Sequence, residues 1–264
     1  MAGHTDGMIE ARGCRIRMMR GGSGPPLLVL HGAGGAGVWL PFMDRLAERF
    51  ELIVPEHPGF GASDTPDWLD TIHDLAYFYL DFLADQGLIG VHLVGLSLGG
   101  WIAAEIAVRC TARLATLTLV DAAGIYLPGV PQSDPFLRSE EQRIRDNFVD
   151  QAVAEAVIAR ALAPEMEDVN LKNRTTTARL AWQPRAHDPH LPKWLHRIDV
   201  PTLVLWGEND VLFPKDYAAA WQRLIPGAKA VVIPRCGHVP NVEKPTEFVA
   251  ALSDFIARRG GAGR

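Results

Sequence analysis

Short apolar runs alternate with amphipathic stretches along most of this chain of 264 residues. Most of the runs are rich in valine, leucine and isoleucine, as strands buried on both faces are. They cover residues 14–20, 27–31, 51–55, 91–96, 115–120, 202–206 and 229–233. Apolar positions at helical spacing fill the intervals at 39–49, 71–87, 99–110, 215–224 and 245–258. This alternation predicts a mostly parallel, doubly wound α/β sheet with helices on both faces.

The first run follows the segment MIEARG, which ends at Gly13. The pair Arg12-Gly13 is a turn signal between two extended segments. It predicts an antiparallel hairpin, which we place at the edge of the sheet. With this hairpin, the predicted sheet has about eight strands.

The alternation of runs and helices stops between Ile125 and Arg197, where no strand pattern occurs. This segment starts with the proline-rich stretch YLPGVPQSDPF and continues with charged and apolar residues at helical spacing. We therefore predict a helical cap inserted at 125–197, between core segments at 1–124 and 198–264.

Composition narrows the partners and the compartment. Hydrophobic residues make up 48% of the chain and charged residues 22%, which is typical of a globular protein. The formal net charge is −5 without a basic patch, so we expect no nucleic-acid partner. No apolar run is long enough to span a bilayer, and the N-terminal segment lacks the pattern of a signal peptide.

The cysteines indicate a reducing compartment. Cys14, Cys110 and Cys236 are odd in number and far apart, which fits a reducing environment better than a disulfide framework. We expect a cytoplasmic protein that acts on a small-molecule substrate without a membrane partner, and the sequence leaves a homo-oligomer open.

A candidate catalytic serine lies in the stretch VHLVGLSLGGWIAAE, which contains the pentapeptide G-x-S-x-G around Ser97. An apolar strand pattern precedes this serine and a helix pattern follows it. A serine on such a turn is exposed for nucleophilic attack, and the flanking glycines remove side chains that would clash. The alternative is a serine that only caps the helix in a glycine-rich turn.

A serine nucleophile needs a base, and the base needs a carboxylate to orient it. Among nine histidines, His238 has the best placement, because it follows the run KAVVIP in a loop before the last helix. Asp210 follows the run TLVLW and is the first choice for the acid. Asp121 ends the run ATLTLV and is the rival acid.

A glycine-rich loop follows the run LLVLH and is a candidate to stabilise the negative charge that develops on the carbonyl oxygen of the substrate. The loop at 32–37 has almost no side chains, so its N–H groups can approach a substrate closely. The N–H of Leu98, next to the serine, would be a second donor. The loop lacks the lysine and the Ser/Thr of a P-loop and does not fit G-x-G-x-x-G. We therefore expect no nucleotide cofactor and no metal.

Five stretches carry a wider pattern: HGAGG at 31–35, EHPGFGASD at 56–64, GLSLGG at 95–100, WGENDVLFP at 206–214 and GHVPNVEKP at 237–245. With them, the sequence resembles the α/β-hydrolase superfamily over nearly its whole length. The resemblance implies that Ser97 is the nucleophile, Asp210 the acid and His238 the base. It also implies that the backbone N–H groups of Ala33 and Leu98 form the oxyanion hole.

These residues predict a cofactor-independent serine hydrolase that cleaves a small, mostly apolar carboxylic ester through an acyl-enzyme. Relatives that hydrolyse carbon–carbon bonds of ring-cleavage products often have asparagine before the nucleophile and an aromatic residue after the histidine. This chain has Leu96 and Val239 there, which favours ester hydrolysis. A lactonase or perhydrolase would use the same triad, and a ligand-binding sensor on the same fold is the non-enzyme alternative.

Two further features of the sequence concern the surroundings of the site. The stretch before Pro58 usually begins with aspartate in the family, and we interpret Glu56 as a structural variation in a loop flanking the site. Cap residues that could line a pocket are Phe136, Phe148, Leu180, Trp182 and Trp194, and Arg174 or Arg179 could receive a carboxylate.

Overall fold

The structure is a computed structural model that describes residues 3–131 and 133–260, so the outer ends of the predicted core and one residue of the predicted cap lie outside it. Its sheet has eight strands in the order β1-β2-β4-β3-β5-β6-β7-β8. The strands are β1 (His4–Ala11), β2 (Cys14–Gly21), β3 (Pro26–Leu30), β4 (Glu51–Pro55), β5 (Val91–Leu96), β6 (Leu114–Val120), β7 (Thr202–Gly207) and β8 (Lys229–Ile233).

The first two strands form the predicted antiparallel hairpin, and β2 also pairs antiparallel with β4. All pairs from β4 to β8 are parallel. The mostly parallel sheet of about eight strands is therefore confirmed.

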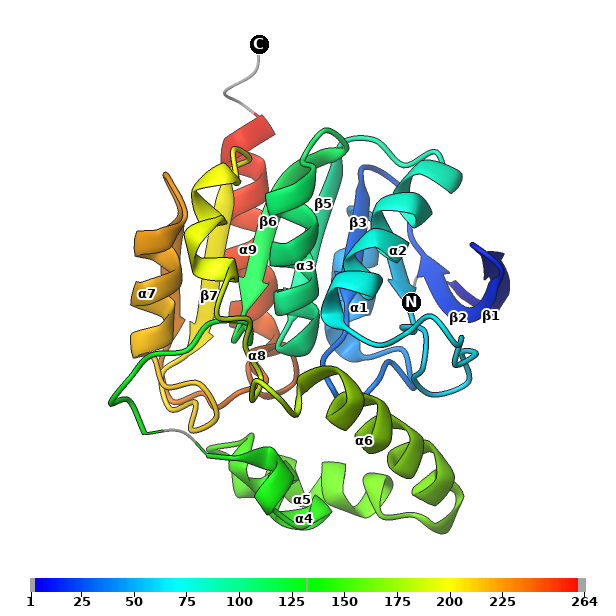
Figure 1. The fold of residues 1–264 in the computed structure, drawn as a ribbon, viewed down its shortest axis with the longest axis vertical. Helices are drawn as coiled ribbons and strands as arrows, with labels where there is room; N and C mark the ends of the chain where they lie inside the picture. The colour runs from blue at the N-terminus through cyan, green and yellow to red at the C-terminus, as the bar shows by residue number, and fades with distance from the viewer. Residues whose placement is uncertain (1–2, 132, 261–264) are drawn as a thin grey trace.

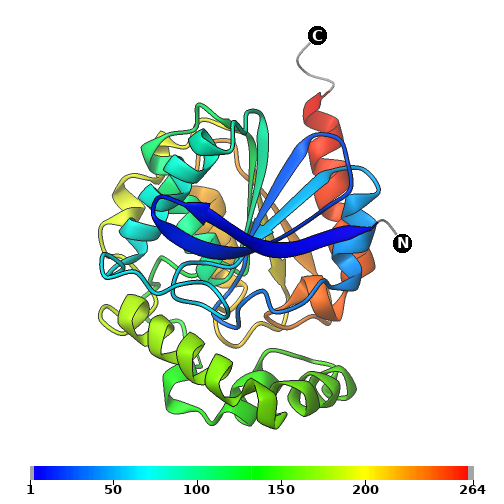
Figure 2. The ribbon, with the colours of Figure 1, turned by 90° about the vertical axis from the view of Figure 1, so that its right-hand side faces the viewer.

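Helices cover both faces of this sheet (Figure 2). On one face lie α1 (Pro41–Ala47) and α9 (Pro245–Gly260); on the other lie α2 (Ile72–Asp85), α3 (Leu98–Arg109) and α7 (Asp216–Leu224). Each face buries its own apolar cluster, because strands such as β5 direct apolar side chains to both sides. None of the helices in the described part of the chain is long and apolar enough to cross a membrane.

The strand β8 is less buried than its apolar sequence predicts. Val231 and Val232 are 38% and 43% exposed, whereas Ile233 lies in the core. The reason is topological, because β8 is the edge of the sheet and pairs only with β7.

Residues 133–197 contain helices and turns, as expected for the inserted segment. Its helices are α4 (Glu140–Asp146), α5 (Gln151–Ala161) and α6 (Glu167–Ala181). They lie together beyond one end of the sheet, apart from the helices on its faces (Figure 1). The chain leaves and re-enters the core at one point, where the N–H of Asp188 donates to Gly124 O at 3.1 Å. The exact boundaries at 125 and 197 stay a prediction.

Candidate active site

Ser97 forms the turn between β5 and α3, and its backbone has φ +53° and ψ −111°. This conformation is costly for a residue with a side chain and persists only where the surroundings enforce it. The flanking glycines show how: a Cβ on Gly99 would lie 2.1 Å from Leu30 O, and one on Gly95 would lie 2.3 Å from Gly99 O. The motif therefore lets a strand, a turn and a helix pack without side chains between them.

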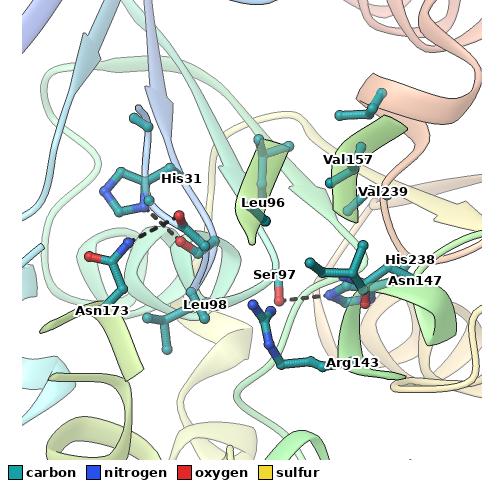
Figure 3. A pocket seen from close by; sticks show the side chains of 18 of the residues that line it. His31, Leu96, Ser97, Leu98, Arg143, Asn147, Val157, Asn173, His238 and Val239 are labelled. Atoms are coloured by element: carbon teal, nitrogen blue, oxygen red, sulfur yellow. Dashed lines mark hydrogen bonds between the residues drawn. The ribbon is translucent and has the colours of Figure 1, made fainter. Parts of the chain in front are cut away.

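Three predicted residues meet at this turn. His238 Nε2 lies 2.8 Å from Ser97 Oγ (Figure 3). His238 Nδ1 lies 2.7 Å from Asp210 Oδ2. Asp210 Oδ1 also accepts the N–H groups of Leu212 at 2.8 Å and Phe213 at 3.1 Å. These donors stabilise the carboxylate, which in turn holds the imidazole proton on Nδ1 and leaves Nε2 free to accept the serine proton. We call Ser97, His238 and Asp210 the triad.

Asp121, the rival acid, does not hydrogen-bond to the histidine. It is fully buried at the end of β6, where its Oδ1 accepts the N–H of Gly207 at 2.9 Å. Burial, and next the negative charge of Asp210, raise the pKa of Asp121 well above its usual value. The structure thus pairs His238 with Asp210, the first choice from the sequence, and not with the rival Asp121.

The glycine loop after β3 lies against the nucleophile turn, since a Cβ on Gly32 would be 3.2 Å from Ser97 Cβ. Ala33 and Leu98 line the same cavity as Ser97. Among the described residues, neither of their N–H groups donates to a protein acceptor. Two free N–H groups near a nucleophile can stabilise an oxyanion.

A buried histidine fixes this loop. His31 Nε2 accepts the N–H of His57 at 2.9 Å, so Nδ1 carries the proton and donates it to Gly32 O at 2.7 Å. Burial lowers the pKa of His31 to about 4, which keeps the ring neutral. Because Gly32 C=O and Ala33 N–H belong to one planar peptide, this hydrogen bond also orients the N–H of Ala33.

The cavity beside the triad has a volume of about 530 Å³. On the side of the core, its lining is mainly apolar, with Val29, Phe42, Met43, Val54, Leu96 and Val120. The inserted helices contribute apolar and polar side chains, among them Phe148, Val157, Arg143, Asn147, Asn173 and Arg174. The cavity therefore lies between the core and the insertion.

Only some of the predicted cap residues line this cavity. Phe136, Phe148 and Arg174 do. The other three candidates do not: Trp182 and Trp194 are about half exposed, and Leu180 is packed in the core, the alternative that the helical spacing also allowed.

Arg179, the other candidate for a carboxylate, points elsewhere. It donates to Leu69 O at 3.2 Å and does not line the cavity. Sequence periodicity could not separate these positions from the lining ones, because it gives the buried face of a helix without saying what covers that face.

Sequence reasoning missed Glu243, a buried residue that holds the histidine loop. Its carboxylate accepts the N–H of Gly237 at 2.6 Å and two N–H groups of the turn at 149–150 at 2.8 and 2.6 Å. The N–H of His238 in turn donates to Asn147 O at 2.9 Å. The base is thus fixed to the insertion, which no local pattern indicates, because a glutamate in NVEKP is typical of a solvated helix start.

Glu56 has a structural environment, in line with its interpretation from the sequence. The carboxylate is 3% exposed and accepts the N–H of Ala62 at 2.7 Å, and Arg17 lies 4.0 Å away. It does not line the cavity.

Two groups of side chains in the described part of the chain have the residue types of a metal site. One consists of Asp121 and two triad residues, whose hydrogen bonds are given above. The other brings together His73, Glu105 and Asp188. There, His73 Nε2 lies 3.1 Å from Asp188 and 3.5 Å from Glu105, which also binds Arg109. Hydrogen bonds and ion pairs account for both groups.

Comparisons with known proteins show the family of the chain. The family described as the alpha/beta hydrolase fold matches residues 25–245. The chain is similar to a 2-hydroxy-6-oxo-6-(2'-aminophenyl)hexa-2,4-dienoic acid hydrolase of Metapseudomonas resinovorans, with 25% identity over 99% of this chain and 94% of that one. It is 27% identical to Lipase 1 of Psychrobacter immobilis over 84% of this chain and 73% of the lipase.

Among solved structures, a membrane phospholipase A superposes with a TM-score of 0.82 and 26% identity. The match covers 97% of this chain and 87% of that one.

Proposed function

Because the chain belongs to the alpha/beta hydrolase fold family and is an enzyme, we propose that it is a serine hydrolase that cleaves small, mostly apolar carboxylic esters. One observation carries the proposal. Hydrogen bonds of 2.7 and 2.8 Å run from Asp210 through His238 to the hydroxyl of Ser97, which lines a mainly apolar cavity.

In the first half of the reaction, Ser97 Oγ attacks the carbonyl carbon while His238 Nε2 takes the hydroxyl proton. Asp210 stabilises the imidazolium that forms. The N–H groups of Ala33 and Leu98 bind the oxyanion, and each such donor contributes about 3 kcal/mol in comparable enzymes. The imidazolium then protonates the leaving alkoxide, and the acyl group remains on Ser97.

In the second half, water replaces the alcohol. His238 takes a proton from water, whose oxygen attacks the acyl carbon, and then returns this proton to Ser97 Oγ. The products are a carboxylic acid and the free enzyme. Every proton is carried by the triad, so the cycle requires no cofactor.

The cavity supports a small substrate. Its volume of about 530 Å³ lies in the range of small-molecule sites. The apolar wall on the side of the core favours an apolar group next to the scissile bond, because such a group leaves water on binding.

Hydrolysis of a carbon–carbon bond in a ring-cleavage product is the second candidate. Arg143 and Arg174 line the cavity, and guanidinium groups bind carboxylates such as those of these acids. The relative from Metapseudomonas resinovorans is, by its name, a hydrolase of a substituted hexadienoic acid, which carries a carboxylate of this kind. Leu96 and Val239 both line the cavity. They favour ester hydrolysis, because carbon–carbon bond hydrolases often have asparagine and an aromatic residue at these positions.

The test combines an active-site label with two substrate classes. We expect a fluorophosphonate to label Ser97 and short p-nitrophenyl esters to be hydrolysed. The Ser97→Ala variant should lose at least about 10⁴-fold in kcat. Ser23→Ala, in an exposed loop, is the matched control and should retain full activity.

Two outcomes would contradict the proposal. Faster turnover of a vinylogous diketone acid than of any ester would assign carbon–carbon bond hydrolysis instead. An unlabelled Ser97 without turnover would favour a ligand-binding sensor.

A further inference from the structure

A second carboxyl group lies behind the triad. Asp121 ends β6 with a left-handed backbone, φ +43°, and is fully buried. Its Oδ1 accepts one N–H, but within the described residues its Oδ2 is buried without a hydrogen-bond partner. A bare carboxylate oxygen in such a place is costly, unless it carries a proton that it donates.

The carboxylate of Asp210 is close enough to accept this proton. Side-chain atoms of Asp121, Asp210 and His238 lie within 4.8 Å of one another. Burial and the negative charge of Asp210 both raise the pKa of Asp121, which favours its protonated form. Asp210 receives three N–H donors and Asp121 receives one, which leaves the proton on Asp121. The thiol of Cys236 is a further titratable neighbour, and burial raises its pKa, so it stays neutral.

We propose that Asp121 is a positioning residue that is protonated at neutral pH and donates this proton from Oδ2 to the carboxylate of Asp210. The protonation of Asp121 does not depend on the proposed function. Only the role of this residue in the reaction rests on it. The hydrogen bond would hold Asp210 in line with His238 Nδ1.

It would also keep the pair of acids at a single negative charge. The strained backbone at Asp121 is consistent with this role, because such strain is retained where the side chain must be aimed.

Infrared spectroscopy tests the proton without a substrate. At neutral pH the protein should show the carbonyl stretching band of a buried, protonated carboxylic acid. Asp121→Asn should remove this band, and Asp216→Asn, which changes an exposed carboxylate, should leave it. A spectrum of Asp121→Asn that retains the band would overturn the proposal, whatever reaction the enzyme catalyses.

Labelling kinetics test the positioning. The amide of Asp121→Asn can donate to Asp210, whereas Asp121→Leu cannot. We expect the rate of Ser97 labelling by a fluorophosphonate at neutral pH to be at least about tenfold higher in the Asn variant than in the Leu variant. In the unchanged protein, we expect the labelling rate to fall at alkaline pH, when Asp121 loses its proton. This fall should be absent from the Asn variant, because an amide does not ionise.

The outcomes are separable. Equal losses in the Asn and Leu variants would show that an ionised Asp121 is required and would overturn the proposal. If the Leu variant does not fold, the pH profile of the Asn variant decides alone: an alkaline fall like that of the unchanged protein contradicts the inference. Failure of Ser97 to label in the unchanged protein would instead contradict the proposed function.

Discussion

Single residues decide whether Ser97 can adopt its strained backbone. The glycine pattern of the sequence was sufficient to predict the turn, because the steric reason for Gly95 and Gly99 is local. Position after a buried strand does not separate Asp210 from Asp121, and the family resemblance was the reason to prefer Asp210. The structure places His238 against Asp210 and not against Asp121, a contact that no local pattern shows.

Gly99→Ala should destabilise the fold and reduce labelling of Ser97. The new Cβ would lie 2.1 Å from Leu30 O, so the turn must move. We expect a loss of about 2–4 kcal/mol in the free energy of unfolding, measured by urea denaturation. Gly7→Ala is the control, because a Cβ there meets nothing within 4 Å. Equal effects of the two substitutions would show that packing at Gly99 is unimportant.

At the scale of elements, the sequence predicted the strands and helices of the core because their apolar periodicity is strong. It did not predict how the insertion attaches. His73 on α2, Glu105 on α3 and Asp188 after the inserted helices form a cluster at this junction. These residues are far apart in the chain, so the cluster exists only after α2 and α3 pack together.

This junction should respond to pH. The hydrogen bond to Glu105, and also the one to Asp188, raise the pKa of His73 against the effect of burial. A raised pKa in the folded state means that the stabilisation is complete below about pH 6.5, the unfolded value, and is lost as the pH rises through the folded value.

His73→Gln measures this contribution. It should lower the free energy of unfolding at about pH 5.5 by at most about 1 kcal/mol, because the side chain is nearly half exposed, and should have little effect at about pH 9. His190→Gln, at an exposed position, should cause no such pH-dependent difference. A loss that grows with pH would contradict the assignment.

At the scale of the molecule, the cavity lies between the core and the inserted segment. The order of these two parts along the chain was predictable from the sequence, but the contacts between them were not. Periodicity predicted helices in the insertion, yet Phe136 and Phe148 line the cavity while Trp182 and Trp194 lie on the surface. The distinction depends on how the inserted segment, with α4 and α6, lies beyond the end of the sheet (Figure 1). Substrate selection is thus a property of the assembled molecule.

A series of p-nitrophenyl esters should reveal the extent of the apolar wall. Each added CH₂ that leaves water can contribute up to about 0.8 kcal/mol, or about fourfold in kcat/KM. We expect kcat/KM to rise with acyl length until the cavity of about 530 Å³ is filled, and then to fall. Ser97→Ala gives the background rate. A series that is flat from acetate onward would show that the acyl group binds outside this cavity.

The contacts of Glu243 have a consequence for synthesis of the chain. The histidine partner of Ser97 lies near the C-terminus and is held by the carboxylate of Glu243 and by Asn147 O. On the ribosome, Ser97 and the insertion emerge first, and no base can reach the serine until the segment 237–243 has followed. Under the proposed function, a nascent chain therefore lacks its base, and hydrolysis can begin only after the inserted helices have been synthesised.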